Sequence, residues 1–103
     1  MKYRNKPTVI DGLRFDSKAE ARRWSELLLL ERAGKISALE RQVAFPIVIG
    51  GVKICKYVAD FVYWQRGRNQ RTVEDVKGVE TDVFRLKAKL VKVCYGIDIE
   101  IVQ

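Results

Sequence analysis

Two aspartates and one lysine near the middle of the chain have the clearest potential for chemistry. A turn is expected at Gly67, and a two-residue type II′ turn that begins with this glycine would pair residues whose numbers add to 135. Asp60 would then lie directly opposite Asp75, with their Cβ atoms roughly 4.5–5.5 Å apart. Lys77 would point to the same face of the sheet, because it lies two residues beyond Asp75.

Two facing carboxylates repel each other unless a cation lies between them. Carboxylate oxygens suit Mg²⁺ or Mn²⁺ better than zinc, and such an ion can activate a water molecule and stabilise the charge that develops at a phosphodiester. Lys77 would position or deprotonate that water and neutralise the phosphate that is cut. In the alternative arrangement both aspartates are solvated and Lys77 forms an ion pair with one of them. The spacing allows either arrangement.

The composition limits the remaining chemistry. The 103 residues include no histidine, which excludes a Ser-His-Asp triad, a Cys-His pair and a zinc site with histidine ligands. Cys55 and Cys94 form no C-x-x-C motif, so we expect reduced thiols and a cytoplasmic protein. The chain has 20 Lys and Arg against 13 Asp and Glu, and its net charge of +7 favours a polyanionic partner, most often nucleic acid.

Length and apolar content indicate one folded domain over residues 1–103. With 48% hydrophobic and 32% charged residues, the chain is too apolar for a disordered protein and too charged for a membrane protein. No segment approaches the roughly 18 uncharged apolar residues of a membrane span. No apolar segment follows the charged start, so we expect neither secretion nor membrane insertion. Residues 1–7 form a short basic arm.

The elements that must position these residues can be read from turn and capping signals. Asp11-Gly12 between apolar flanks predicts a β-hairpin. Ser17-Lys18-Ala19-Glu20 forms a capping box, which predicts a helix from Ser17 to about Ala33 that stops at Gly34. The remaining signals predict an extended segment at 36–49 interrupted at Pro46, strands at 53–64 and 71–77, a helix at 82–95 ending at Gly96, and a strand at 97–101. This order predicts a mixed sheet with helices packed against it.

The first helix carries acidic residues within its apolar stripe. The apolar members of the stripe are Ala21, Trp24, Leu27 and Leu28. Glu20 is either the N3 residue of the capping box or a functional carboxylate, because an idle carboxylate beside Trp24 would be costly to bury. Glu31 is expected to pair with a basic residue. Leu29 and Leu30 lie outside the stripe, which is compatible with a second subunit covering this helix on another side.

Basic residues lie on two sides of the second helix. Arg85, Lys89 and Lys92 share one side and form either a solvated face or phosphate contacts. Lys87 lies inside the apolar arc and either extends to the surface or lies near the phosphate that is cut. In the arm, Lys2, Arg4 and Lys6 either track a nucleic-acid backbone or are disordered. Packing in the sheet is the expected role of Tyr57, Tyr63 and Trp64.

Three segments together resemble the PD-(D/E)xK nuclease superfamily, which has the restriction-endonuclease-like fold. These segments are Glu20 on the first helix, Ala59-Asp60-Phe61, and Val73-Glu74-Asp75-Val76-Lys77-Gly78. The resemblance covers most of the chain and is closest to small phage proteins related to Holliday-junction resolvases of the phage endonuclease I type. It implies an α/β restriction-endonuclease-like core, in which a helix, three strands, a helix and a strand form one nuclease-like domain.

The resemblance also implies roles for single residues. Asp60 and Asp75 would be metal ligands together with the Val76 carbonyl. Glu20 would bind or orient the metal, directly or through water, and Lys77 would be the catalytic lysine.

This chain departs from the family pattern at two positions. Ala59 replaces the family's proline, and Asp75 replaces the more common glutamate with a shorter side chain. Glu74 is adjacent to Asp75, but the alternation of a strand would point it to the face opposite Lys77. Asp75 is therefore the expected ligand.

The activity that the resemblance implies is that of a Mg²⁺- or Mn²⁺-dependent endonuclease. It would hydrolyse DNA phosphodiester bonds, selectively in branched or Holliday-junction DNA, in the cytoplasm of a bacterium or a phage-infected host cell. A homodimer is implied as well, with no membrane and no small-molecule cofactor. The alternatives are a non-catalytic nucleic-acid-binding module with the same fold and a phage structural or assembly protein.

Overall fold

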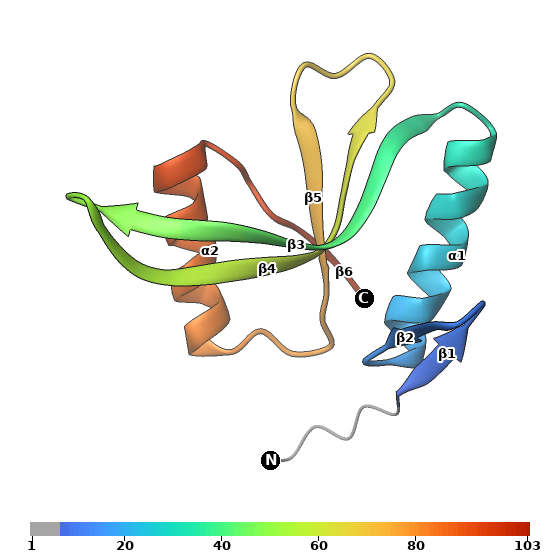
Figure 1. The fold of residues 1–103 in the computed structure, drawn as a ribbon, viewed down its shortest axis with the longest axis horizontal. Helices are drawn as coiled ribbons and strands as arrows, with labels where there is room; N and C mark the ends of the chain where they lie inside the picture. The colour runs from blue at the N-terminus through green and yellow to red at the C-terminus, as the bar shows by residue number, and fades with distance from the viewer. Residues whose placement is uncertain (1–6) are drawn as a thin grey trace.

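One helix lies on each side of a four-stranded mixed sheet (Figure 1). The computed structural model describes residues 7–103, so the arm residues Lys2, Arg4 and Lys6 lie outside the described part. The sheet has the strand order β3-β4-β5-β6, with antiparallel pairing from β3 to β5 and parallel pairing of β5 with β6. In chain order the elements are β1 (Thr8–Ile10), β2 (Leu13–Phe15), α1 (Lys18–Arg32), β3 (Ile36–Ile49), β4 (Val52–Gln65), β5 (Arg71–Val76), α2 (Asp82–Tyr95) and β6 (Glu100–Val102).

Turn and cap signals place the ends of the helices and of the first hairpin. Asp11 (φ 50°) and Gly12 (φ 80°) close the β1–β2 hairpin with the two positive φ angles of a type I′ turn. Ser17 caps α1, since its Oγ accepts a hydrogen bond from the Glu20 N–H at 3.1 Å. Gly96 ends α2 in the left-handed conformation, with φ 71°. The predicted hairpin and both predicted helices are confirmed.

Two predictions about strands were wrong in detail. Residues 36–49 form one continuous strand, β3, which Pro46 does not interrupt. A proline is tolerated there because β3 lies at the edge of the sheet, where one of its sides has no ladder to complete. Strand β6 covers Glu100–Val102 rather than 97–101, although Ile97 and Ile101 pack toward the core as the predicted alternation requires.

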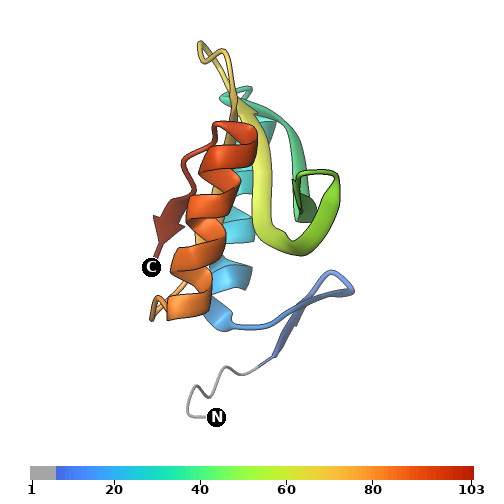
Figure 2. The same cartoon turned by 90° about the vertical axis from the view of Figure 1, so that its left-hand side faces the viewer.

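The sheet separates two apolar cores, and Figure 2 shows α2 in front of the strands with α1 behind them. The core beside α2 contains Phe45, Ile47, Tyr57, Ala59, Val62, Val73, Phe84, Val91 and Ile97. The core beside α1 contains Phe15, Ala21, Leu27, Ile36, Phe61 and Tyr63. Strand β4 contributes to both, because Tyr57 and Ala59 belong to the first core, and Phe61 and Tyr63 to the second. Asp60 therefore lies where β4 passes from one core to the other.

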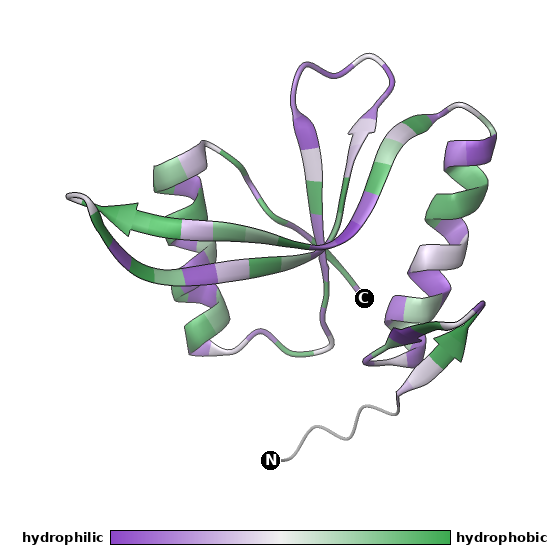
Figure 3. Ribbon diagram, in the orientation of Figure 1, coloured by the Kyte–Doolittle hydropathy of each residue, from purple (hydrophilic) through white to green (hydrophobic). Residues whose placement is uncertain are grey.

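The surface agrees with several expectations from composition. Apolar residues run along the β3–β4 hairpin, whereas hydrophilic residues gather in the loop between β4 and β5 (Figure 3). Leu29 and Leu30 on α1 are 62% and 37% exposed, so they lie outside the buried stripe as predicted. Cys55 and Cys94 are free thiols, as expected. Within residues 7–103, neither helix has the length and apolar character needed to cross a bilayer.

The register between β4 and β5 is the predicted one, but the turn is different. The paired residues are Phe61 with Glu74, Val62 with Val73, Tyr63 with Thr72 and Trp64 with Arg71, and the numbers in each pair add to 135. A wider loop over residues 66–70 joins the strands instead of a two-residue turn. Gly67 (φ 87°) occupies a turn that the Arg68 N–H closes on the Gln65 carbonyl at 3.1 Å. The ladder ends at Phe61 and Glu74, one step before the predicted pair of Asp60 and Asp75.

Glu74 forms a buried ion pair on the α1 side of β5. Its side chain is 1% exposed and accepts hydrogen bonds from Arg23 Nε at 2.9 Å, from Arg23 Nη2 at 2.7 Å and from the Tyr63 hydroxyl. Burial and the hydrogen bond to Glu74 raise the pKa of Tyr63 to about 12, so this hydroxyl remains a donor at neutral pH. The predicted orientation of Glu74, away from Lys77, is confirmed.

Replacing Glu74 by alanine is expected to lower the free energy of unfolding by about 3 kcal/mol, because the substitution leaves the half-buried Arg23 guanidinium and the Tyr63 hydroxyl without their acceptor. Urea unfolding followed by circular dichroism measures this loss. Glu26→Ala is the control: Glu26 is the exposed second partner of Arg23, and its removal should change stability by less than about 0.5 kcal/mol. Equal effects of the two substitutions would contradict a structural role for Glu74.

Candidate functional site

Carboxylates from three different elements meet beside the end of β5. Glu20 comes from α1, Asp60 from β4 and Asp75 from β5. Gln42 of β3 joins two of them, since its Nε2 donates to Glu20 Oε2 at 3.0 Å and to Asp60 Oδ1 at 3.3 Å. The Val76 N–H donates to Asp60 Oδ2 at 2.8 Å. Glu20 is thus joined to Asp60 through Gln42, and Asp60 lies close enough to Asp75 for their side chains to interact.

Asp75 and Lys77 lie on the same side of β5, as predicted. Lys77 Nζ is 3.5 Å from Asp75 Oδ1 and 4.7 Å from the centre of the Phe84 ring. The second oxygen of Asp75 accepts a hydrogen bond from the Tyr57 hydroxyl at 2.5 Å. Asp75 is only 4% exposed, so the alternative in which both aspartates are solvated is wrong for this residue, although its ion pair with Lys77 is present.

Burial raises the pKa of two carboxyl groups in this region, Asp60 and Glu20. Burial, together with the negative charges of Asp75 and Glu20, raises the pKa of Asp60 to about 7, although the Val76 N–H acts in the opposite direction. Burial also raises the pKa of Glu20, helped by the charge of Asp16 and opposed by the charge of Arg41. Burial and the hydrogen bond to Asp75 raise the pKa of Tyr57 far above its ordinary value. Its hydroxyl therefore stays protonated and always donates.

Glu20 takes part in the start of α1 and also reaches the carboxylate cluster. It is 4% exposed, and its backbone N–H makes the capping bond to Ser17. Its Oε1 accepts from the Asp16 N–H at 3.3 Å at the start of the helix, while its Oε2 faces Gln42 in the cluster. Glu31, expected to pair with a basic residue, instead accepts a hydrogen bond from the Leu39 backbone N–H at 3.1 Å.

The donor chemistry of this cluster fits a hard divalent cation. Within residues 7–103, no group of three or more acidic or cysteine side chains already has the arrangement of a metal site. The available ligands are nevertheless carboxylate oxygens, which Mg²⁺ and Mn²⁺ prefer, and a cation would relieve the crowding of charge that raises the pKa of Asp60. Glu20, Asp60 and Asp75 are the residues that would hold it. The role of the Val76 carbonyl stays a prediction.

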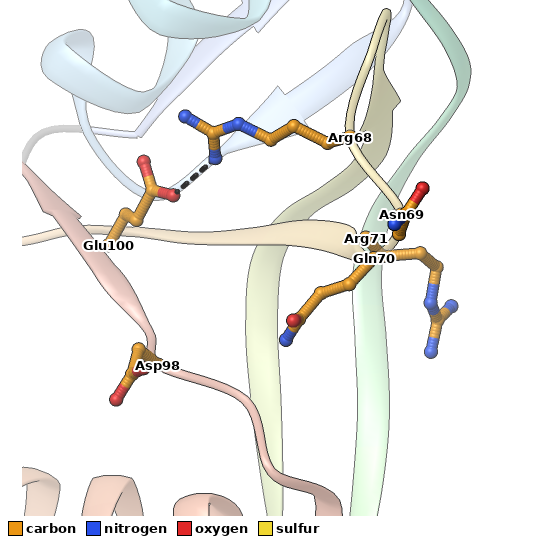
Figure 4. Close-up of a pocket in the computed structure, with 6 residues that line it drawn as sticks. All are labelled: Arg68, Asn69, Gln70, Arg71, Asp98 and Glu100. Carbon is orange, nitrogen blue, oxygen red and sulfur yellow. Dashed lines mark hydrogen bonds and ion pairs between the residues drawn. The ribbon is translucent and has the colours of Figure 1, made fainter.

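Cavities with basic residues open on both sides of the carboxylates. One of about 370 Å³ contains Asp75 and Lys77 together with Lys56 and Lys87. Another, of about 250 Å³, is lined by Arg14, Asp16, Glu20, Arg41 and Gln42. A cavity of about 320 Å³ lies away from the carboxylates, between the β4–β5 loop and β6, where Arg68 and Glu100 form an ion pair at 3.3 Å (Figure 4).

The basic residues of α2 that were predicted to contact nucleic acid lie in different surroundings. Lys87 lines the cavity beside Asp75. Arg85 and Lys92 are instead engaged in exposed ion pairs, with Asp82 and Asp98 respectively, each at 2.9 Å. Lys89 is exposed on α2 and lines none of the cavities described above.

Sequence reasoning missed three residues of this region. Tyr57, interpreted as sheet packing, binds Asp75, and Lys56 lines the cavity next to it. Gln42 has a positive φ of 54°. This backbone conformation costs energy in a residue other than glycine, so it persists only where the surrounding structure enforces it. No sequence signal marks Gln42, because only the β3–β4 register of the folded chain places it opposite Asp60, between the pairs Arg41–Phe61 and Val43–Ala59.

The raised pKa of Asp60 predicts that the metal-free protein loses stability as the pH rises. Asp60 titrates near 3.8 in the unfolded chain and at about 7 in the folded one, so the folded state binds more protons between these values. Asp60→Asn removes this penalty. Thermal unfolding in EDTA should show a melting temperature above that of the wild type at about pH 8 and a much smaller difference at about pH 4.

The exposed Asp82 provides the control for this experiment, because Asp82→Asn removes a carboxylate far less buried than Asp60. This variant should keep the pH dependence of the wild type. An Asp60→Asn protein with an unchanged pH dependence would contradict the crowding of carboxylates.

Comparison with known proteins identifies the family. A family model described as "Protein of unknown function (DUF1064)" matches residues 1–101. No curated protein and no solved structure gives a match. Since the match extends over nearly the whole sequence, the chain belongs to the DUF1064 family.

Proposed function

We propose that this protein is a divalent-metal-dependent endonuclease that hydrolyses phosphodiester bonds in DNA. The observation that carries the proposal is the meeting of Glu20, Asp60 and Asp75 from three elements, with the Lys77 ammonium 3.5 Å from Asp75. A carboxyl group whose pKa is raised by burial and by neighbouring charges at a cavity, as that of Asp60 is, marks a candidate functional site. Glu74, the residue before Asp75, differs because Arg23 neutralises it.

The order of the elements supports a restriction-endonuclease-like fold. A helix with a glutamate precedes three antiparallel strands, the second and third of which carry Asp60 and the Asp75-Val76-Lys77 sequence. A second helix then leads to a strand parallel to the third. This is the arrangement expected from the resemblance to PD-(D/E)xK nucleases, so both the fold and the reaction are proposed on the same residues.

Each residue of the cluster has a defined part in the proposed reaction. A bound divalent ion supplies Lewis-acid activation of water and stabilises negative charge on a phosphate oxygen. Asp60 and Asp75 hold that ion, and Glu20 binds or orients it from α1. Tyr57 fixes one oxygen of Asp75 through its hydrogen bond, which directs the other oxygen toward Lys77.

Lys77 is placed to act on the phosphate and the attacking water. Its ammonium group lies between Asp75 and the Phe84 ring, which restricts its position. From there it neutralises the phosphate that is cut and orients the water for in-line attack. The net charge of +7 supports a polyanionic substrate. Selectivity for branched DNA and a homodimer built on the exposed Leu29 and Leu30 are part of the proposal.

The first experiment incubates the full chain with branched, linear double-stranded and single-stranded DNA, and with RNA, in Mg²⁺, Mn²⁺ or EDTA. We expect metal-dependent cleavage with a preference for branched DNA. Binding without products in any metal would favour the non-catalytic nucleic-acid-binding module. Weak binding to every nucleic acid would favour the structural or assembly protein.

Asp60→Ala and Lys77→Ala are each expected to lower the rate of DNA cleavage at least about 100-fold. Binding of DNA in EDTA should stay within a few-fold of the wild type, because neither residue is needed for the fold or for most phosphate contacts. Gel assays of product and fluorescence anisotropy measure the two quantities. Asp82→Asn, a change at an exposed carboxylate on α2, should cut at the parent rate; parent rates in either site variant would refute these roles.

A further inference from the structure

The cavity of about 370 Å³ beside Asp75 collects positive charge from three parts of the chain. Lys56 comes from β4, Lys77 follows β5 and Lys87 comes from α2. The remaining wall is formed by Tyr57, Val58, Thr81, Val83 and Phe84. Asp75 is the acidic residue of this lining, so the cavity carries a charge excess of two.

Two of these lysines have no acidic partner among residues 7–103. Lys77 is paired with Asp75, whereas no ion pair of Lys56 or Lys87 occurs within the described range, 7–103. The Tyr57 hydroxyl is already used, since it donates to Asp75, whereas the Thr81 Oγ accepts from the Phe84 N–H as the cap of α2 and keeps its hydrogen as a donor. The charged donors that no acid neutralises are the ammonium groups of Lys56 and Lys87.

Two other cavities lack this imbalance. The one beside Glu20 has two arginines, Arg14 and Arg41, against two acids, Asp16 and Glu20. The cavity in Figure 4 likewise has Arg68 and Arg71 against Asp98 and Glu100. An anion would meet as many negative as positive groups in either place, so neither of them favours an anionic ligand as the lysine cavity does.

We propose that Lys56 and Lys87 bind one phosphate group of the nucleic-acid strand that lies at the carboxylates. This inference rests on the proposed function, because a strand at Asp75 would bring a phosphate to this cavity. A single phosphate bridging two ammonium groups from β4 and α2 would also fix the direction of the strand across the sheet. Lys56 and Lys87 are thus positioning residues, and Lys77 remains the catalytic one.

The test measures DNA binding in EDTA as a function of salt, so that no cleavage is required. The variants are Lys56→Ala, Lys87→Ala and the double variant. The control with the same change of charge is Lys35→Ala/Lys53→Ala, which removes two exposed lysines that do not line this cavity. Anisotropy with a labelled four-way DNA junction gives the slope of log K against log salt, and thermal unfolding checks the fold of each variant.

If one phosphate is bound by both lysines, the double variant should flatten the slope by about one and lower the affinity about tenfold at ~0.1 M salt. Either single variant should produce most of that loss, because the two lysines act on the same group. The control variant should keep a slope close to that of the wild type.

Several results would overturn the inference: an equal loss in the control, which indicates diffuse charge; additive losses that flatten the slope by about two, which indicate separate phosphates; or no loss at all. Absence of DNA binding by the wild type would overturn both the cavity and the proposed function. If binding follows the expected pattern but no metal yields products, the proposed cleavage fails and the phosphate site stands.

Discussion

The burial of acidic side chains around Asp60 is the constraint on which the rest of this structure depends. Three carboxylates drawn partly out of water are unfavourable unless donors surround them. The fold supplies such donors from each neighbouring element: the Gln42 amide from β3, the Val76 N–H from β5 and the Tyr57 hydroxyl from β4. These donors do not fully offset the cost of ionising Asp60, because burial and the charges of Asp75 and Glu20 still raise its pKa to about 7.

The alternation of strand β5 places its two acidic side chains in different surroundings. Glu74 faces α1, where Arg23 and Tyr63 donate hydrogen bonds to both oxygens of its carboxylate. These buried bonds connect α1 to the sheet. Asp75 faces α2 and shares its oxygens between Tyr57 and Lys77. Two neighbouring acids of similar chemistry thus have opposite electrostatic surroundings, because successive side chains of a strand point to opposite faces.

Local signals were sufficient for much of the fold. The Ser17 cap, the Asp11-Gly12 turn and Gly96 act within a few residues, so they fix the ends of elements without reference to the rest of the chain. The β4–β5 register was also predicted correctly from sequence, although the strands are joined by a longer loop than the predicted two-residue turn.

The parts that could not be predicted depend on contacts between distant elements. Gln42 reaches Glu20 and Asp60 only because β3 pairs with β4 after a register shift between Ser37 and Glu40, and because Gln42 itself has a positive φ. Lys87 and Lys56 share a cavity only through the packing of α2 against β4. Neither the contacts of Gln42 nor the shared cavity of Lys56 and Lys87 produces a periodic pattern in the sequence.

The alternation of β5 also limits how the length of this chain can change during evolution. The exposed loop over 66–70 makes few contacts with the cores, so insertions there leave both strands in place. A single inserted or deleted residue between Arg71 and Lys77 would exchange the faces of Glu74 and Asp75. It would leave Arg23 without its partner and remove a carboxylate from the cluster in the same step, so descendants of this sequence should differ in the loop and keep the strand's length.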